Sequence, residues 1–303
     1  MSEHFEVLNQ EFNEKRYSRR FIDTYIREEI AASPMLTERI QIGTQMIEHW
    51  MSQDYYDSKN ARLKQLFALD IEELVTDVLV GIAYFVREEL FTSVSAQLAG
   101  RLGFSDKPDA IKTMAEIIAV LSYMDIFAIR KKTRGSSMML ISHMQFSAKV
   151  MDQIEQSEYL PPMVCKPKKL LNNRSSGYLF GGDSLILKAN NHHDGDICLD
   201  VLNLMNNVPL ALSTEFLSTI EEVPSEAPVT QDQLDNWNRF KIQSYRFYKL
   251  MVDQGNRFHL THKVDKRGRA YAQGYHISTQ GSSFKKAMIE LADKEYIEGV
   301  PMP

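Results

Sequence analysis

Three prolines in one short run divide this chain of 303 residues into two parts of different character. Pro161, Pro162 and Pro167 lie in the run LPPMVCKPKKL. This run cannot be regular helix, because proline lacks a backbone N–H and clashes with the preceding turn. The hydrophobic pattern before it is helical, and the chain after it mixes strand-like and helical segments. The sequence therefore predicts a mainly helical α+β fold, with a helical N-terminal domain over residues 1–159.

Apolar residues recur at helical spacing in the first part. The run FIDTYIREEIAAS is typical of a helix that ends before Pro34, and an amphipathic stretch follows from Glu38 to Met51. A further apolar stripe takes positions i, i+3, i+4 and i+7 of one helix. Its members are Met114, Ile117, Ile118 and Leu121. We expect this stripe to pack in a core and assign it no other role.

The pattern then changes to that of a hairpin. The strand-like runs DIFAIR and SSMMLISHM flank a tip that contains Gly135, whose backbone freedom suits a turn. We predict a β-hairpin at about residues 125–143. Its basic residues are Arg130, Lys131, Lys132 and Arg134.

The second part falls into three stretches. Residues 160–230 hold the strand-like runs GYLF and SLILKA, the polar loop ANNHHDGD, a helical region over 197–220 and the acidic linker EEVPSEAPVT. Residues 231–258 read as one long helix with apolar residues at 3-4-3-4 spacing. Residues 259–303 begin with the strand-like run HLTHKVD. The spaced residues of the long helix are Trp237, Phe240, Ser244, Phe247 and Met251.

The net charge of −5 hides a strong segregation of charge. Residues 126–151 and 159–182 contain no Asp or Glu, and residues 254–289 contain only Asp265. Each stretch carries several Lys and Arg. One such stretch alone would be read as a solvated loop that faces no partner, but three in an acidic chain favour a surface for a polyanion.

The compartment is suggested by the cysteines and by the N-terminal run. Cys165 and Cys198 are the only cysteines, which argues against a disulfide framework and for a reducing cytoplasm. The start MSEHFEVLNQ lacks the apolar core of a secretion signal, so we expect a protein that is not secreted. No stretch approaches the roughly 18 apolar residues of a membrane span, so we expect no membrane partner.

The string from Asp265 to Tyr271, DKRGRAY, carries the most specific chemistry. Arg269 offers a planar charged fork that grips a phosphate with two hydrogen bonds. Asp265 is able to pair with an arginine or cap local amides, which would fix that fork. Gly268 removes a side chain where a backbone must approach a polymer. The ring of Tyr271 suits contact with a base or sugar.

The string resembles the D-x-x-G-R-x-Y motif of single-subunit phage and mitochondrial RNA polymerases, and its flanks strengthen the likeness. Downstream, Gln280-Gly281, Lys286 and Leu291-Ala292 match that family's run of Gln-Gly, Lys and Leu-Ala. Upstream, the run from Leu160 to Pro167 is similar to its Pro-Met-Val segment, and Gly177-Tyr178 follows in place of the family's Gly-Gly-Tyr or Gly-Ala-Phe. The helix VLNLMNNVPLALSTEFLSTI is weakly similar, and residues 112–143 take the place of a helix and an intercalating hairpin.

The resemblance implies half of a polymerase. Only 34 residues follow Arg269, and the family's metal-binding aspartates, its nucleotide-contacting Lys and the Tyr of its fingers helix have no counterpart here. The chain most resembles the small subunit of a two-subunit phage RNA polymerase. The resemblance thus implies no catalytic residue and no metal ligand in this chain. Mg²⁺ would be held by a larger C-terminal-half subunit, in the cytoplasm of an infected bacterial host.

The resemblance also implies a role for each basic group. It places template or RNA–DNA hybrid contacts on Asp265, Arg267, Gly268, Arg269, Tyr271 and Lys286. It makes residues 231–258 a reduced thumb and 259–303 the start of a palm that the partner completes. The hairpin residues Arg130, Lys131, Lys132 and Arg134 would meet the upstream edge of the DNA bubble. Attraction to the DNA backbone is our hypothesis for Lys166, Lys168 and Arg174.

Three alternatives remain open at this stage. The chain could be a stand-alone nucleic-acid-binding regulator of transcription with a polymerase-like tail. The run His192-His193-Asp194-Gly195-Asp196 could belong to a metal hydrolase, although a polar surface loop is the better reading, because adjacent histidines point apart. The chain could also be a fragment of a longer protein.

Overall fold

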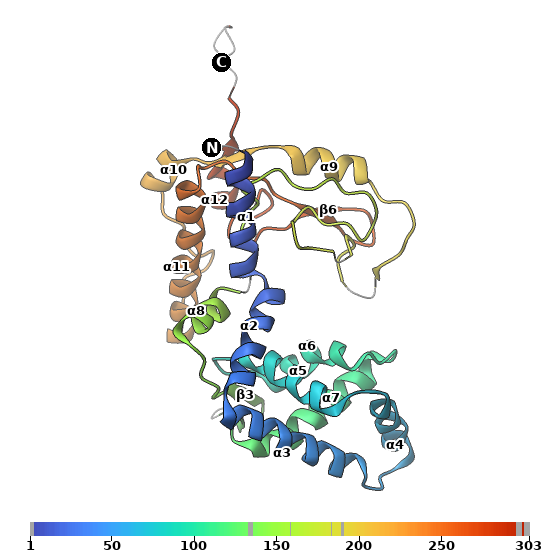
Figure 1. The fold of residues 1–303 in the computed structure, drawn as a ribbon. Coiled ribbons are helices and arrows are strands. Elements are labelled where there is room, and N and C mark those ends of the chain that lie inside the picture. Colours follow the sequence, from blue (N-terminus) through green and yellow to red (C-terminus); the bar gives the residue numbers. More distant parts are fainter. Residues whose placement is uncertain are drawn as a thin grey trace. The chain divides into compact units, whose positions relative to one another are not determined.

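The chain forms two compact units in a computed structural model (Figure 1). The helical unit is Arg19–Glu155, and the mixed unit joins Met1–Ser18 to Gln156–Pro303. The described part of the chain is mainly helical with small antiparallel sheets, which confirms the predicted α+β class. None of its helices is both long and apolar enough to cross a membrane. The structure describes residues 3–132, 136–157, 159–182, 184–188, 191–294 and 299.

The helical unit consists of helices and one small sheet. The sheet has the order β1-β3-β2, and β3 pairs with both neighbours in antiparallel fashion. The predicted hairpin is confirmed, since Phe127 lies opposite Ser142 and Lys131 opposite Met138. Its elements are α2 Arg19–Ala32, α3 Pro34–Met51, α4 Asp57–Lys64, α5 Ile71–Ala83, β1 Glu89–Leu90, α6 Phe91–Leu98, α7 Lys107–Leu121, β2 Phe127–Lys131, β3 Met138–Ser142 and α8 Ala148–Gln156, whose last residue belongs to the mixed unit.

Local signals set the ends of these helices. Pro34 begins α3 at a position that needs no N–H, and the Ser33 hydroxyl accepts a hydrogen bond from the Leu36 amide. Asp70 caps α5 and Asp106 caps α7 in the same manner. The expected break before Pro34 is therefore confirmed, with α2 ending at Ala32.

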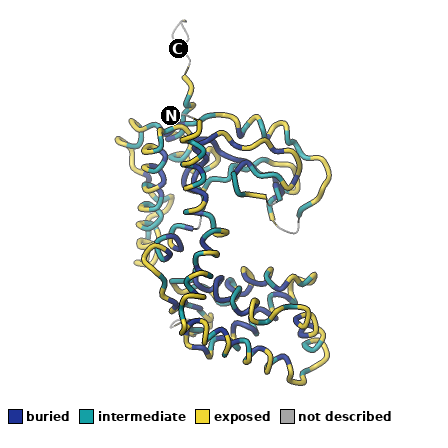
Figure 2. The backbone as a smooth tube through the Cα atoms, viewed as in Figure 1, coloured by how far each residue is buried: buried dark blue, intermediate teal, exposed yellow. Residues whose placement is uncertain are grey.

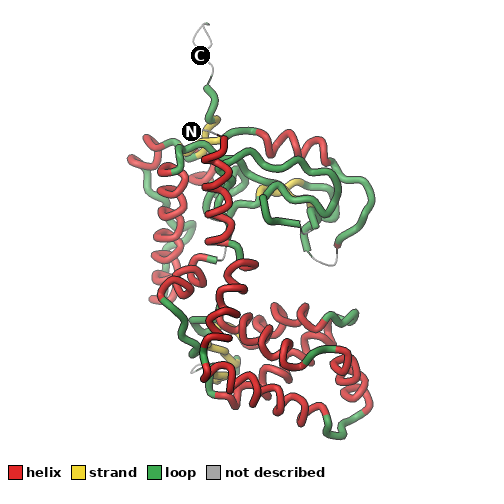
Figure 3. The backbone as a smooth tube through the Cα atoms, in the orientation of Figure 1, coloured by secondary structure: helices red, strands yellow, loops and turns green. Residues whose placement is uncertain are grey.

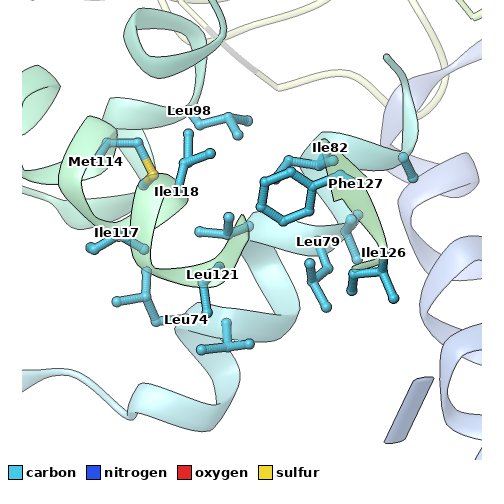
Figure 4. Packing of buried hydrophobic residues seen from close by; sticks show 14 of the residues in the cluster. Leu74, Leu79, Ile82, Leu98, Met114, Ile117, Ile118, Leu121, Ile126 and Phe127 are labelled. Carbon is cyan, nitrogen blue, oxygen red and sulfur yellow. The ribbon is translucent and has the colours of Figure 1, made fainter. Parts of the chain in front are cut away.

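The core of the helical unit is built from the predicted stripe of α7. Its four members have no exposed surface, and they pack with residues of α5, α6 and β2 (Figure 4). Burying each such side chain contributes about 1.5–3 kcal/mol. The inward faces of the helices are accordingly buried along their length (Figure 2).

A glycine allows α3 to approach α7 and α5 closely. A Cβ atom at Gly43 would lie 2.6 Å from the Met124 sulfur, 3.0 Å from Leu121 Cδ2 and 3.2 Å from Val75 Cγ1. Such distances lie inside van der Waals contact, so an added methyl group would require the surrounding core side chains to shift. Gly100, by contrast, has nothing within 4 Å of the same position.

We predict that Gly43→Ala lowers the free energy of unfolding of the helical unit by about 1–3 kcal/mol, because overpacking outweighs the better helix propensity of alanine. Urea unfolding, followed by Trp50 fluorescence in a Trp237→Phe background, measures the change. The control Gly100→Ala should stay within about 0.5 kcal/mol of the parent. Equal stability of the two variants would contradict the packing argument.

The mixed unit joins short strands and helices through long irregular segments (Figure 3). Its strands pair as β4 with β7 and β5 with β6, both antiparallel. The elements are α1 Glu3–Tyr17, α9 Leu199–Asn207, β4 Leu210–Leu212, α10 Thr214–Thr219, α11 Gln231–Asp253, β5 His262–Val264, β6 Ala270–Ala272, α12 Ser283–Ala287 and β7 Ile289–Leu291.

Two expectations for this unit need correction. The run GYLF and the described residues 184–188 of SLILKA are not strands, and among these residues only Ile186 forms a bridge, parallel to Val264. The predicted helical region over 197–220 is instead α9, β4 and α10, because Val208 and Pro209 end the first helix. The linker over 221–230 has no regular structure, but Glu222 within it is only 7% exposed.

The first helix packs with the mixed unit, although the predicted domain of residues 1–159 placed it with the helical part. Its buried face is polar. Glu14 accepts hydrogen bonds from the amides of Leu179 and Phe180 at 2.8 and 2.9 Å, and Gln10 accepts one from the Val164 amide at 2.9 Å. These side chains satisfy backbone groups of the irregular segment, so α1 is fixed there by hydrogen bonds.

The predicted long helix over 231–258 is present as α11 but ends at Asp253, and it packs by the predicted stripe. A capping box of Thr230 and Gln233 begins it, and Ser244, Phe247 and Met251 are buried. His276 packs against this face: its ring stacks on Phe247 at 5.0 Å and its Nδ1 lies 2.8 Å from the Ser244 hydroxyl. Burial and the nearby Lys285 ammonium lower the pKa of His276 to about 4.

We predict that the mixed unit loses stability as pH falls from 6.5 towards 4. Between these pH values His276 is protonated in the unfolded chain, where its pKa is near 6.5, but stays neutral in the folded chain. Because the unfolded state binds the extra proton, acid favours unfolding. The loss attributable to this residue is at most about 3 kcal/mol. Urea unfolding of His276→Phe, followed by Trp237 fluorescence in a Trp50→Phe background, should show a smaller pH slope than the parent.

His259 and His262 also have lowered pKa values because of burial, so part of the slope should remain in that variant. Ser244→Ala serves as a control, since it removes the hydroxyl partner but keeps the titrating ring. An unchanged slope in His276→Phe would rule out this source of acid sensitivity.

Candidate nucleic-acid interface

The motif forms the tip of the β5–β6 hairpin. His262 lies opposite Ala272, Lys263 opposite Tyr271, and Val264 opposite Ala270. The five residues between the strands close the turn, and the Asp265 amide donates to the Arg269 carbonyl at 2.9 Å. The hairpin therefore presents Lys266, Arg267 and Arg269 at an exposed tip.

The carboxylate of Asp265 organises this tip. Its Oδ1 accepts hydrogen bonds from the amides of Arg267 and Arg269 at 2.9 and 3.0 Å, and its Oδ2 accepts from Arg269 Nε at 2.8 Å. Arg269 Nη2 lies 2.7 Å from the same oxygen. Desolvation opposes ionisation of the carboxyl group, but the backbone and side-chain hydrogen bonds of Arg269 lower the pKa of Asp265 below its usual value.

The two arginines keep free surface despite this pairing. Their side chains are 64% and 54% exposed at Arg267 and Arg269, while that of Asp265 is only 17% exposed. The Arg269 guanidinium lies 5.7 Å from the centroid of the Tyr271 ring, and the Tyr271 hydroxyl lies 3.5 Å from Asp265 Oδ2. The Arg269 guanidinium is thus oriented before any ligand binds, and part of its N–H donors remains available to an anion.

Gly268 is needed by the backbone of the turn. Its φ is +80°, and a Cβ atom there would meet nothing within 4 Å. The glycine is therefore required by the left-handed backbone of the turn, where other residues are strained. The close approach of a polymer at Gly268, which the sequence argument proposed, stays a prediction.

Gln280 ties the downstream flank of the motif to the hairpin. Its side chain accepts a hydrogen bond from the Ala272 amide at 2.9 Å and donates to the Ala270 carbonyl at 3.0 Å. The chain then enters α12, where Lys286 is exposed. Lys285 beside it is half-buried and donates to the Tyr275 carbonyl, and burial lowers the pKa of Lys285. Of the two lysines, Lys286 is the one available to a ligand.

The cations of the proline-rich segment have unequal freedom. Lys166, Lys168 and Arg174 are all exposed, but the Lys168 ammonium also donates to the Leu179 carbonyl at 2.9 Å. Sequence reasoning missed Lys188, an exposed cation that the parallel Ile186–Val264 bridge brings towards the start of the motif loop. Nothing in the local sequence indicates this pairing, because it joins segments far apart in the chain.

The hairpin cations belong to the helical unit. Arg130, Lys131 and Lys132 are exposed along β2 and just beyond it, and the Lys132 amide donates to the Ser137 carbonyl at 2.9 Å. Arg134, which was predicted with them, lies outside the described residues. The structure thus groups Asp265, Arg267, Gly268, Arg269 and Tyr271 in one tip and the hairpin cations in another.

The histidine pair lies in a surface loop. His192 Nδ1 is 2.7 Å from the Ser184 hydroxyl and its Nε2 is 3.1 Å from Asp194 Oδ1, while His193 is exposed. Asn173 holds the loop through the carbonyls of His193 and Gly195, both at 2.7 Å. Within the described residues no three His, Cys, Asp or Glu side chains are placed to hold a metal ion.

Comparisons with known proteins add no relative. No protein-family model matches the chain, and no curated protein matches it. The likeness to single-subunit RNA polymerases therefore rests on the motif residues and their flanks.

We predict a graded effect of substitutions at Asp265. Asp265→Ala should speed amide hydrogen exchange at Arg267 and Arg269 at least severalfold, since both amides lose their acceptor. Asp265→Asn should keep much of this protection, because an amide oxygen still accepts, but should free the Arg269 side chain. Asp293→Ala, which breaks the exposed pair with Arg257, should leave the tip unchanged. Unaltered amide hydrogen exchange in Asp265→Ala would show that the Asp265 carboxylate does not hold these two amides.

Proposed function

We propose that this chain is the non-catalytic small subunit of a two-subunit, phage-type DNA-directed RNA polymerase. The observation that carries the proposal is the motif tip, in which one carboxylate presets an exposed arginine fork within a D-x-x-G-R-x-Y string. In this role Arg267, Arg269 and Tyr271 contact the template or the RNA–DNA hybrid, and Lys286 adds a backbone contact. The acid-poor stretches supply further attraction to phosphates.

Catalysis is assigned to a larger partner chain. Nucleotidyl transfer uses two Mg²⁺ ions that carboxylates hold, which activate the attacking hydroxyl and stabilise the leaving pyrophosphate. In the proposal those carboxylates belong to the partner, and no step is placed on this chain. The contribution of this chain is to position nucleic acid beside the partner's site.

The proposal extends to the remaining segments. Residues 259–303 would begin the palm, α11 would be a reduced thumb, and the β2–β3 hairpin with Arg130, Lys131 and Lys132 would meet the upstream edge of the bubble. Lys166, Lys168 and Arg174 would attract the DNA backbone. The protein would act in the cytoplasm of an infected bacterial host.

The test combines this chain with the product of the neighbouring open reading frame, provided that product carries the two aspartate motifs. We expect the two proteins to co-purify and to incorporate NTPs on a DNA template with Mg²⁺, whereas neither does so alone. Failure of this product to bind or to restore synthesis would refute the proposed subunit.

We predict that Arg269→Ala leaves assembly intact and slows elongation by the complex about 10- to 100-fold, as expected for loss of one charge-assisted contact. Arg257→Ala is the matched control: it removes an exposed arginine of the same acid-poor stretch that pairs with Asp293 outside the motif. Single-turnover elongation rates measure both variants. Wild-type elongation by Arg269→Ala would refute the role of the fork.

A second candidate is a stand-alone transcription regulator, which the exposed and already organised tip also suits. Such a protein would bind single-stranded DNA with strong salt dependence as a stable monomer. It would never restore NTP incorporation with a second chain, and this outcome separates the two candidates.

A further inference from the structure

The strand β7 stands at the end of a ladder of short antiparallel pairings. The backbones of Met163 and His259 exchange hydrogen bonds at 2.9 and 2.7 Å, and those of Leu210 and Phe258 do so at 2.8 and 2.9 Å. The other side of β4 then pairs with β7. Four chain segments thus lie side by side, and β7 is the last of them among the described residues.

The outward face of β7 carries backbone groups that β4 does not use. The Ser213 amide donates to the Met288 carbonyl at 2.8 Å, and the Ala292 amide donates to the Pro209 carbonyl at 3.1 Å. Because bonding positions alternate along an antiparallel pair, Glu290 also faces β4. Ile289 and Leu291 therefore direct their N–H and C=O groups away from β4, to the open edge.

Other strand edges in the mixed unit are closed. The outer edge of β6 is capped by the Gln280 side chain, which bonds Ala270 and Ala272. The outer edge of β5 is paired, since Val264 exchanges hydrogen bonds with Leu185 and Leu187 at 2.9 and 2.7 Å. Within the described residues nothing covers the edge of β7 in this way.

The side chains of β7 indicate what kind of strand would fit. Leu291 is 58% exposed and lies opposite Leu210, and Ile289, two residues before it, packs against the core of this unit. The intervening Glu290 pairs with Lys294 at 2.9 Å. One face of the edge is thus apolar and the other charged, which suits an extended segment of alternating apolar and polar residues.

We propose that β7 accepts an extended strand of the larger polymerase chain, with an apolar side chain of that strand beside Leu291. The inference rests on the proposed function, because the occupant is the partner named there. Main-chain hydrogen bonds would supply affinity and the apolar position would set the register. An open apolar edge otherwise promotes aggregation, so a partner strand would also protect the chain.

The test uses the full chain and the same reading-frame product. Leu291→Pro removes the outward N–H and leaves the β4 pairing intact, because proline is accepted where a strand N–H faces outwards. We expect this variant to weaken the complex by about tenfold or more. Leu291→Ala keeps the N–H group and should weaken the complex less than Leu291→Pro does. Leu291→Lys, which changes only the side chain, gives a second disruptive variant should Leu291→Pro fail to fold.

Amide hydrogen exchange provides the second measurement. The amides of Ile289 and Leu291 should exchange rapidly in the free chain and slowly in the complex. An active complex in which these amides stay unprotected and Leu291→Pro binds normally would overturn the strand addition while the proposed function stands. Absence of any complex with the parent chain would overturn both. Protection of these amides already in the free chain, by a second copy or by its own C-terminal residues, would also overturn the proposed strand addition.

Discussion

The mixed unit depends on hydrogen bonds from side chains to an irregular backbone. Buried N–H and C=O groups need partners, and the long segments of this unit that lie outside helices and strands cannot obtain them from regular secondary structure. Asn203 bonds both the amide and the carbonyl of Leu170, and Asn256 bonds both groups of Leu212. Glu14 serves two amides of the 160–188 segment from another part of the chain. Amide and carboxylate side chains here take the place of missing strand neighbours.

The motif tip uses the same device for a different purpose. Asp265 satisfies two amides of the turn and, with its second oxygen, holds the Arg269 fork. One carboxylate thus both stabilises the turn and orients the Arg269 guanidinium. A rigid fork loses less entropy when an anion arrives, which is the physical advantage of this arrangement. In the proposed function this tip would hold nucleic acid in a fixed register.

The helical unit is stabilised in another way. Its core of aliphatic side chains follows the 3.6-residue period, and the side chains of Ser33, Asp70 and Asp106 cap the N-termini of α3, α5 and α7. This is why the sequence predicts it well. The α7 stripe, the helix break before Pro34 and the β2–β3 hairpin were all predictable, since each follows from neighbours a few residues apart. The close approach at Gly43 and the pairing of β1 with β3 required the tertiary structure.

The sequence by itself determined the mainly helical class, the long helix α11, the irregular proline-rich segment and the motif that marks the candidate site. Tertiary structure alone decided that α1 joins the mixed unit, that SLILKA forms one bridge in place of a strand, and that Gly268 serves the turn. It also decided that Lys285 is held while Lys286 is exposed. The physical reason is the range of the interactions. Periodicity and caps are local, whereas the partners of backbone groups in irregular segments come from residues remote in sequence, and no local pattern encodes them.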